Sequence, residues 1–392
     1  MRRDASSTTA PLSVLVALVL VACASTEPKS RSDEDAGPYA ELVDQGIDRY
    51  LGTSQSESES TDADGVVTHT FAVADGPVCL RGAPYRTAIR DRGHGDLLLF
   101  LQGGGMCYSG FCLAIESAAP GIPPLDVLDP DLAANPVRDW DVVYLPYCDG
   151  SLFGGDAVHD DDGDGELDRF HAGLANLSAS LDLAHATFPT PRRILLAGSS
   201  GGGYGTLPGT VLVRLLWPDT PLYVFNDAGV GLGRDGEPSF IGGIVEELGG
   251  TDLLPASEPE LIAQGHLTPL IGWQLAQDPQ LRVAAFSATE DFVISSVYLS
   301  TTGPLFHGWL TTQLDAVGEA EPERFHRYLL PGTVHTTLLG DPSGFVEGDA
   351  DDLSFLTDFL GGLETTTVDG VGVASWMTAF LDDDPAWADV GQ

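Results

Sequence analysis

The sequence has very few basic residues. Among 392 residues there are 18 lysines and arginines against 58 aspartates and glutamates, which gives a formal net charge of −40, and Lys29 is the only lysine. A surface this acidic repels polyanions, because many like charges build one repulsive field. We therefore expect no nucleic-acid partner and no attraction to anionic lipid headgroups.

Long apolar runs are also scarce. One run, residues 11–21, follows two arginines near the N-terminus; it is short for a membrane span but has the length of a signal-peptide core. It ends in LVAC, residues 20–23, which resembles the lipobox of bacterial lipoproteins, where the cysteine becomes the acylated N-terminus. We expect residues 1–22 to be a lipoprotein signal peptide and Cys23 to anchor an exported protein in the bacterial cell envelope. The alternative is an ordinary signal peptide cut nearby, which would give a secreted protein.

Cysteine is scarce as well, with five in the chain. Without Cys23 an even number remains, which in an oxidising compartment favours two disulfides over a metal site or a thiol nucleophile. Four cysteines allow three pairings, and the sequence by itself does not choose among them. The four are Cys79, Cys107, Cys112 and Cys148.

Composition divides the chain into three parts. Residues 24–38 are polar and charged without periodicity, which is typical of a flexible tether. Residues 39–51 have the apolar spacing of one short amphipathic helix, and residues 53–65 (TSQSESESTDADG) are typical of a solvated loop. We therefore expect a tether and a short N-terminal helix over residues 23–65, and a compact domain over residues 66–392.

From residue 66 onward, short apolar runs alternate with helical patterns, and no internal repeat is evident. This alternation predicts an α/β fold with βαβ units and a mostly parallel central sheet that has helices on both faces. The expected strands are residues 96–101, 140–145, 193–197, 222–225, 282–286 and 328–330. The expected helices are residues 172–187, 202–216 and 371–381.

The segment ILLAGSSGGGYG, residues 194–205, places a glycine-rich turn directly after an apolar run. Residues 198–202 (GSSGG) fit G-x-S-x-G, which forms a nucleophile elbow when it lies between a strand and a helix. A phosphate-binding loop would need a G-K-[ST] ending that is missing here, and a simple tight turn leaves this many glycines unexplained. We expect Ser200 to be a nucleophile.

A serine nucleophile needs a general base that a third group orients. In this class of fold the chain order is serine, then acid, then histidine. His335 follows the expected strand at residues 328–330, on a loop that can reach over the end of the sheet, and we expect it to be the base. The other histidines after Ser200, for which structural roles come more easily, are His266, His307 and His326.

Two aspartates are candidates for the orienting acid. Asp291 follows the expected strand at residues 282–286 and precedes His335, as the chain order demands. Asp227 also ends a strand, but it comes directly after the elbow helix. We prefer Asp291, with Glu290 as a neighbour that complicates the assignment.

Acyl transfer also requires N–H donors for the developing oxyanion, and losing one donor typically costs about 2.7 to 4 kcal/mol. The backbone N–H of Gly201, directly after the nucleophile, is one expected donor. The segment LLLFLQGGGMC places Gly103, Gly104 and Gly105 directly after the strand at residues 96–101. We expect this second glycine cluster to supply another donor.

Five motifs, taken together and in this order, resemble the pectin acetylesterase/Notum family: LQGGGMCYSGFC, LPYCDGSLFGGD, GSSGGGYG, FNDAG and GTVHTTL, spread over residues 79–338. The resemblance implies an α/β-hydrolase-like fold and carboxylesterase activity through Ser200, Asp291 and His335, with no cofactor required for catalysis. For the oxyanion hole it implies Gly104, Gly105 and Gly201, and for the disulfides the pairs Cys107–Cys112 and Cys79–Cys148. The chain departs from the family at Met106, where the family usually has Trp, and at Gly201, where it usually has Ala.

The expected substrate is an acyl ester, foremost an acetyl ester, carried by a polysaccharide or by a small molecule. Pectin fits poorly, because polygalacturonate is an anion that this acidic protein repels at low salt unless calcium or arginines intervene. A neutral acetylated polysaccharide fits the charge better, and we expect a monomer. The alternative function is a surface lipoprotein that binds glycans or calcium and keeps a hydrolase fold without turnover.

An acidic segment, HDDDGDGELDRFH at residues 159–171, resembles the first nine positions of a calcium-binding loop. Carboxylates alternate, a glycine stands at the sixth position and an apolar residue at the eighth, but His171 stands at the twelfth, where a bidentate Glu normally closes the shell. A bound calcium would be structural, and the alternative is a solvated acidic turn. The candidate ligands are Asp160, Asp162, Asp164 and Asp168.

Overall fold

The computed structural model describes Met1 and residues 37–340 and 357–391. The predicted signal peptide at residues 1–22 lies almost wholly outside the described residues, and Cys23 lies outside them too. The described residues from Gly37 onward form one compact unit. Within the described part of the chain, no helix is long and apolar enough to cross a membrane.

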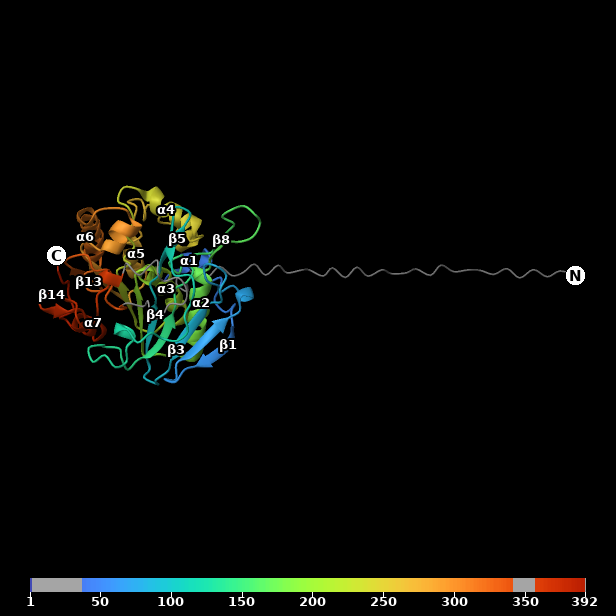
Figure 1. The fold of residues 1–392 in the computed structure, drawn as a ribbon, viewed down its shortest axis with the longest axis horizontal. Helices are drawn as coiled ribbons and strands as arrows, with labels where there is room; N and C mark the ends of the chain where they lie inside the picture. The colour runs from blue at the N-terminus through green and yellow to red at the C-terminus, as the bar shows by residue number, and fades with distance from the viewer. Residues whose placement is uncertain (2–36, 341–356, 392) are drawn as a thin grey trace. The chain divides into compact units, whose positions relative to one another are not determined.

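A nine-stranded sheet forms the centre of the compact unit, in the order β1-β2-β3-β7-β4-β10-β11-β12-β13. Its six strands from β7 to β13 are parallel, and β1, β2 and β3 join them through antiparallel pairs. Figure 1 shows β1 and β3 toward one side of the sheet and β13 at the other. The predicted mostly parallel sheet is therefore confirmed. The strands are β1 Ser56–Thr61, β2 Val67–Phe71, β3 Arg86–Arg90, β4 Asp96–Leu101, β7 Asp141–Leu145, β10 Arg193–Ser199, β11 Leu222–Asp227, β12 Leu281–Ala288 and β13 Phe325–Leu330.

The central strands are buried on both faces. In β4, Leu97 and Leu99 point into one core, whereas Leu98 and Phe100 point into a second core on the opposite face. Successive side chains of a strand point to opposite faces, so a strand covered on both sides reads as a continuous apolar run. This explains why DLLLFL was recognisable from the sequence.

Helices cover both faces of the sheet, but unequally. Side chains of α2, α3, α5 and α6 join the larger core, while α7 packs on the other face through Trp376, Met377 and Phe380. The predicted helical layers are thus present, with most of the helical cover on one side. The helices are α1 Ala40–Asp44, α2 Gly173–Thr187, α3 Gly201–Leu216, α4 Pro238–Glu247, α5 Pro269–Gln277, α6 Gly303–Ala320 and α7 Val373–Leu381.

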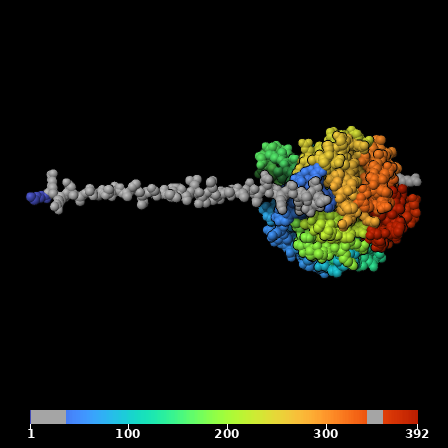
Figure 2. Space-filling view, turned by 180° about the vertical axis from the view of Figure 1, so that it is seen from behind, coloured from blue at the N-terminus to red at the C-terminus, as the bar shows by residue number. Residues whose placement is uncertain are grey.

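The compact unit begins earlier than the predicted boundary at residue 66. Leu42 and Ile47 are fully buried in the larger core, and the Gln45 amide donates to the backbone oxygen of Leu254 at 2.8 Å. Figure 2 shows the blue surface of this N-terminal part beside the yellow surface near residue 250. Helix α1 is shorter than expected, because Gly46 has a φ of 89° and turns the chain. The predicted short helix and the segment after it, residues 39–65, therefore pack with the compact unit.

The segment at residues 53–65, which was expected to be a loop, contains strand β1 (SESEST). Its side chains are almost all exposed, so it carries no apolar alternation from which a strand could be recognised. β1 is one edge of the sheet. At the other edge, Val390 pairs with Tyr328 of β13, and the Leu329 N–H donates to the Val390 oxygen at 2.8 Å.

The structure contains two disulfides, Cys79–Cys148 and Cys107–Cys112. They are the pairings that the family resemblance implied. Cys107–Cys112 closes a hairpin of β5 Gly105–Tyr108 and β6 Phe111–Ala114. Cys79–Cys148 joins positions 69 residues apart, so it constrains the unfolded chain far more than the bridge that spans five residues.

Removing the long-range disulfide should therefore destabilise the protein more than removing the short one. From the loop lengths we expect losses of about 4 kcal/mol for Cys79→Ala with Cys148→Ala and about 2 kcal/mol for Cys107→Ala with Cys112→Ala. Urea unfolding of the two double variants beside the wild type measures both losses. A larger loss for the short bridge would contradict the argument.

Candidate active site

The predicted site residues follow neighbouring strands of the parallel part of the sheet. The glycine cluster follows β4, Ser200 follows β10, Asp291 follows β12 and His335 follows β13. The carboxyl ends of parallel strands meet at one edge of a sheet, where ligand sites of open α/β folds are found. The topology therefore brings residues that are up to 232 positions apart in the chain to the same edge.

Ser200 occupies a sharp turn between β10 and α3. It is the N-cap of α3, with a φ of 55° and a ψ of −119°. A non-glycine residue with this backbone is strained, and such strain persists only where surrounding contacts impose it. Here the Ser200 N–H donates to the Asp227 backbone oxygen at 2.8 Å, and the Ser200 backbone oxygen accepts from the Tyr204 N–H at 3.1 Å. The turn has the strained strand-to-helix form that the motif predicts.

The two glycine clusters lie against each other. A Cβ at Gly103 would come within 2.5 Å of the Ser199 backbone oxygen and 2.9 Å of the Ser200 Cβ. A Cβ at Gly202 would lie 2.0 Å from the Leu101 backbone oxygen. Both approaches are possible only without a side chain. The loop after β4 is therefore in contact with the turn that carries Ser200.

The amides expected to bind an oxyanion lie in this contact zone. Gly105 has a φ of 87°, and its backbone oxygen would be 3.2 Å from a Cβ on Gly201. Gly201 is the first residue of α3, and the first amides of a helix have no partner within the helix. The partial positive charge at this helix end also favours a negative ligand. Gly104 precedes Gly105, and its oxygen accepts from the Ile115 N–H at 2.8 Å, which fixes the loop.

His335 and Asp291 form a buried hydrogen-bonded pair. The His335 Nδ1 lies 2.7 Å from Asp291 Oδ2, and both side chains are almost fully buried. The other carboxylate oxygen of Asp291 accepts from the Ile294 N–H at 3.0 Å. Because a carboxylate oxygen accepts, Nδ1 donates the proton of this hydrogen bond, and Nε2 is the ring nitrogen left for a second partner. Asp291 rather than Asp227 is thus the acid that contacts His335, while the roles of base and orienting acid stay predictions.

His335 Nε2 is buried and has no hydrogen-bond partner among the described residues. Ser200 and His335 are thus not hydrogen-bonded to each other, although the loops that carry them are joined through Asp227. Hydrogen bonds between catalytic groups are often long or absent without substrate. The structure therefore pairs His335 with Asp291 and leaves Nε2 without a partner among the described residues, and the complete triad stays a prediction.

The other candidates have different partners. His266 Nδ1 accepts from the Gly233 N–H at 3.1 Å, and His326 Nδ1 lies 3.0 Å from Asp389 near the C-terminus. His307 lies on α6. Asp227 contacts Ser199 and the loop after His335 rather than the imidazole. None of the three histidines lies at the elbow.

A cavity with apolar walls opens beside Ser200. Together with adjoining open space it has about 430 Å³ of empty volume, and Met106, Phe240 and Tyr298 are among the residues that line it. A second apolar cavity adjoins it, with about 700 Å³ of empty volume when the open space around it is included. The two share four lining residues, which are Leu152, Tyr204, Ile241 and Ile244.

The sequence analysis missed most residues of these walls. They come from α4 and from the π-helical turn Val293–Tyr298, which carry no recognisable motif, and from the loop at residues 150–153, which lies in the family motif LPYCDGSLFGGD but was given no role there. Leu152 and Phe153 both have positive φ values, 58° and 60°. The Leu152 N–H donates to the buried Tyr147 hydroxyl at 2.9 Å, which holds this strained loop in place.

The acidic segment forms an exposed loop between β8 Ala157–His159 and β9 Arg169–His171. Ligand atoms of Asp160, Asp162 and Asp168 lie within 4.8 Å of one another, but Asp164 is not part of this group. His171, at the twelfth position, turns into the interior and contacts the Asp149 oxygen at 3.0 Å. The arrangement lacks the closing ligand of a calcium loop, and calcium binding stays a prediction.

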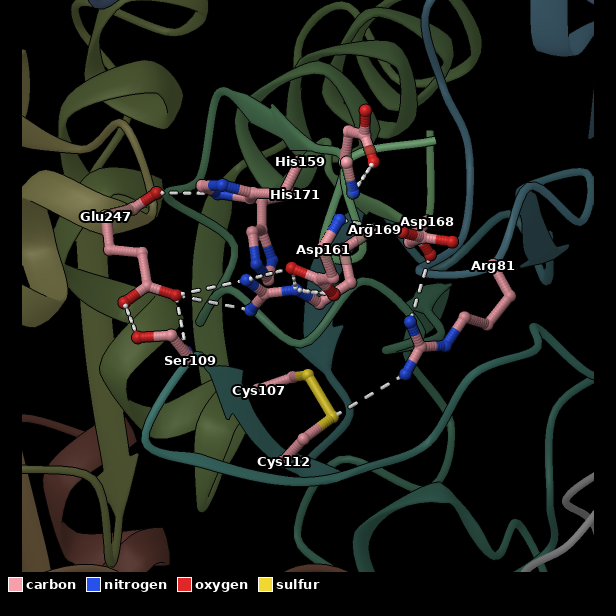
Figure 3. Close-up of polar contacts among 12 residues, drawn as sticks. Arg81, Cys107, Ser109, Cys112, His159, Asp161, Asp168, Arg169, His171 and Glu247 are labelled. Carbon is pink, nitrogen blue, oxygen red and sulfur yellow. Dashed lines mark hydrogen bonds and ion pairs between the residues drawn. A yellow bond between two sulfur atoms is a disulfide. The ribbon is translucent and has the colours of Figure 1, made fainter. Parts of the chain in front are cut away.

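Charged contacts connect this hairpin to the cavity walls. The Arg169 guanidinium lies 2.7 Å from Asp161 and 3.2 Å from Glu247, the last residue of α4. Glu247 also accepts from the Ser109 hydroxyl at 2.8 Å, next to the β5–β6 disulfide (Figure 3). Helix α4 and the hairpin after the glycine cluster are thereby joined on the outside of the cavity.

Comparisons with known proteins agree with the motifs. Residues 57–235 match the family model described as Pectinacetylesterase. The predicted family resemblance is confirmed. The pectinacetylesterase match includes both glycine clusters and Ser200, whereas Asp291 and His335 lie beyond its end. No curated protein sequence matches the chain.

The solved structure of the Wnt deacylase Notum from Drosophila is similar in fold. Its sequence is 14% identical, the TM-score is 0.55, and the alignment covers 86% of this chain and 98% of the Notum chain. The fold is α/β-hydrolase-like, as predicted. The pectinacetylesterase match supports an esterase function for the chain.

Acidification should destabilise the fold through His171. Burial lowers the pKa of His171 from 6.5 to about 4, so the unfolded chain takes up this proton first. The contribution of His171 to stability is therefore present above pH 6.5 and lost as the pH falls to 4, by about 3 kcal/mol. Burial raises the pKa of Asp149 from 3.8 to about 6. The folded protein therefore takes up the Asp149 proton first, and this uptake increases the free energy of unfolding as the pH falls from 6 to 4, against the effect of His171.

Because the effects of His171 and Asp149 oppose each other, the pH dependence of the wild type alone does not isolate His171. The test therefore compares His171→Gln with the wild type. We expect the unfolding free energy of the variant, measured in urea at intervals between pH 4 and 6.5, to lack this loss on acidification. An equally steep fall in both proteins would show that His171 does not titrate in this way.

Proposed function

We propose that this protein is an exported serine carboxylesterase that forms an acyl-enzyme on Ser200. The observation that carries the proposal is the strained backbone of Ser200 at the β10–α3 turn, where two glycine clusters meet at the mouth of a cavity. Strain of this kind has a purpose where it presents a side chain to a ligand. The pectinacetylesterase match and the buried His335–Asp291 pair support the same reaction.

In the proposed reaction, the Ser200 hydroxyl oxygen attacks the ester carbonyl carbon while His335 Nε2 takes the hydroxyl proton. The carbonyl oxygen becomes an oxyanion, which the amides of Gly201 and of Gly104 or Gly105 stabilise. His335 then passes the proton to the leaving alcohol. Water, deprotonated by His335, attacks the acyl-enzyme, and the carboxylic acid leaves as Ser200 regains its proton.

Asp291 keeps the imidazole oriented in this scheme. Its carboxylate is fully buried and holds Nδ1, which leaves Nε2 to accept the Ser200 proton in the proposed reaction. The charge of Asp291 also stabilises the imidazolium that forms in each step. Ser200 and His335 have to approach each other when the substrate binds, because no hydrogen bond joins them in its absence.

The walls beside Ser200 favour an apolar acyl group. Two adjoining cavities with apolar walls extend from Ser200, and they share Leu152, Tyr204, Ile241 and Ile244, so an acyl chain that enters the first is directed toward the second. We therefore infer that the enzyme accepts acyl chains longer than acetyl, while the alcohol part remains a neutral saccharide or a small molecule. A strongly acidic surface disfavours an anionic polymer such as pectin.

Two disulfides support the export of the protein, because such bonds persist mainly in oxidising compartments. The signal peptide and the acylated Cys23 stay predictions from the sequence.

The proposal predicts hydrolysis of p-nitrophenyl butyrate that depends on Ser200. Ser200→Ala removes the attacking oxygen and should lower kcat by at least about 10³-fold, since triad residues act as a unit. Ser199→Ala, one position away, tests for indirect disturbance of the turn and should lose much less. Equal rates for the wild type and Ser200→Ala would favour the non-catalytic binding protein instead.

The acyl cavity predicts a chain-length preference. We expect kcat/KM for p-nitrophenyl esters to rise from acetate to octanoate in the wild type. Ile244 lines both cavities and is buried. Ile244→Trp should fill the space and reduce kcat/KM for octanoate by at least about 10-fold, because a large side chain in a packed site excludes the acyl group.

Ile244→Ala is the matched variant at the same position and should keep the octanoate activity. The kcat/KM for the acetate ester should change less than about threefold in both variants. An equal loss with acetate and octanoate would instead indicate damage to the reacting groups. A wild type that prefers acetate, with Ile244→Trp unaffected, would contradict the acyl assignment.

A further inference from the structure

Asp227 has a buried carboxylate that the proposed reaction leaves without a role. It is the last residue of β11 and lies between β10 and β12, the strands that precede Ser200 and Asp291. Its side chain is completely buried. An ionisable group in this position is costly to bury, so its contacts have to compensate for the loss of water.

One set of contacts holds the turn of the nucleophile. The Ser199 hydroxyl donates to Asp227 Oδ2 at 2.6 Å, and the Ser200 N–H donates to the Asp227 backbone oxygen at 2.8 Å. The two residues pair in register, Ser199 opposite Asp227. Asp227 therefore binds the nucleophile's turn through both its side chain and its main chain.

A second set of contacts holds the loop of the base. The Thr337 N–H lies 3.1 Å from each carboxylate oxygen of Asp227, and the Leu338 N–H donates to Oδ2 at 2.9 Å. These amides come two and three residues after His335. A carboxylate that accepts several backbone N–H groups fixes the loop that supplies them.

The electrostatics fit a carboxylate that lies close to the base without binding it. Burial raises the pKa of Asp227 to about 6, while the donors Ser199, Leu338 and Thr337 and the charge of His335 act in the opposite direction. The imidazole donates its hydrogen bond to Asp291 instead. Asp227 thus touches both loops that carry reacting atoms, and neither of the reacting atoms themselves.

We propose that Asp227 is a positioning residue: by binding Ser199 and the amides of Thr337 and Leu338 with one carboxylate, it sets the distance between Ser200 and His335. The inference rests on the proposed function, because it assumes that these two residues react together. A displacement of the order of 1 Å between reacting groups is enough to lower a rate about 100-fold.

Asp227→Asn is the first test. The amide keeps the shape but has one acceptor oxygen and an NH₂ group that faces donors. We expect kcat for p-nitrophenyl butyrate to fall about 10- to 100-fold, from misplacement of the reacting groups. KM should change less than about threefold, since the cavity that binds the acyl group does not include Asp227.

Asp141→Asn is the matched control. Asp141 is also buried, and it accepts from the backbone N–H groups of Arg92 and Gly95 at 2.7 and 2.9 Å. It begins β7, so it lies at the opposite end of the parallel strands from Ser200. We expect Asp141→Asn to lower the free energy of unfolding by about as much as Asp227→Asn does, while its kcat stays at the wild-type value.

A second measurement follows the Ser200 oxygen directly. A fluorophosphonate reagent transfers its phosphonyl group to an activated serine oxygen and releases fluoride. The labelling rate of Asp227→Asn should fall in parallel with kcat, and that of Asp141→Asn should not. Ser199→Ala, which removes only the 2.6 Å hydrogen bond, should give a smaller fall of about 3- to 10-fold in both quantities; it decides the question if Asp227→Asn does not fold.

The outcomes separate the two proposals. If the wild type is labelled at Ser200 and both Asp227→Asn and Ser199→Ala keep its labelling rate and kcat, the positioning role is wrong and the esterase function stands. If Asp141→Asn loses kcat as strongly as Asp227→Asn, the effect is general destabilisation and the role is also wrong. If the wild type is neither labelled nor active, both proposals fail together.

Discussion

The site depends on one close contact between two stretches of backbone. The chain after β4 passes so near the turn after β10 that a side chain at Gly103 or Gly202 would overlap main-chain oxygens. This contact excludes every residue except glycine and forces the amides of one loop toward the serine of the other. The strained conformation of Ser200, the helix end that begins at Gly201 and the cavity beside them all follow from it. Without the contact, the same residues would lie at the same edge of the sheet but would not form a site.

Much of this arrangement was predictable, because the apolar runs, the glycines and the order of the polar residues along the sequence all indicated the same fold. Buried parallel strands read as apolar runs, so β4 and β10 were recognisable, and glycines directly after both strands located the contact. The chain order of nucleophile, acid and base selected Asp291 and His335 from several candidates. The structure pairs those two side chains.

The rest depended on tertiary contacts that leave no pattern in the sequence. Strand β1 is polar and exposed, so its pairing with β2 gives no apolar alternation, and the start of the compact unit was placed too late for that reason. The cavity walls come from segments such as α4 whose apolar residues resemble any core helix. The contacts of Asp227 with the loop after His335 are visible only in the folded chain, because that loop lies 110 positions further along the sequence.

Both edges of the central sheet have features that oppose pairing with strands of other chains. At one edge, β1 presents serines and glutamates to solvent, and at the other edge the segment around Val390 occupies the hydrogen-bonding groups of β13. Open strand edges are templates for aggregation, and charged or covered edges prevent it. At high local concentration, the edge strands of this sheet therefore offer few free backbone groups with which the strands of a neighbouring copy could pair.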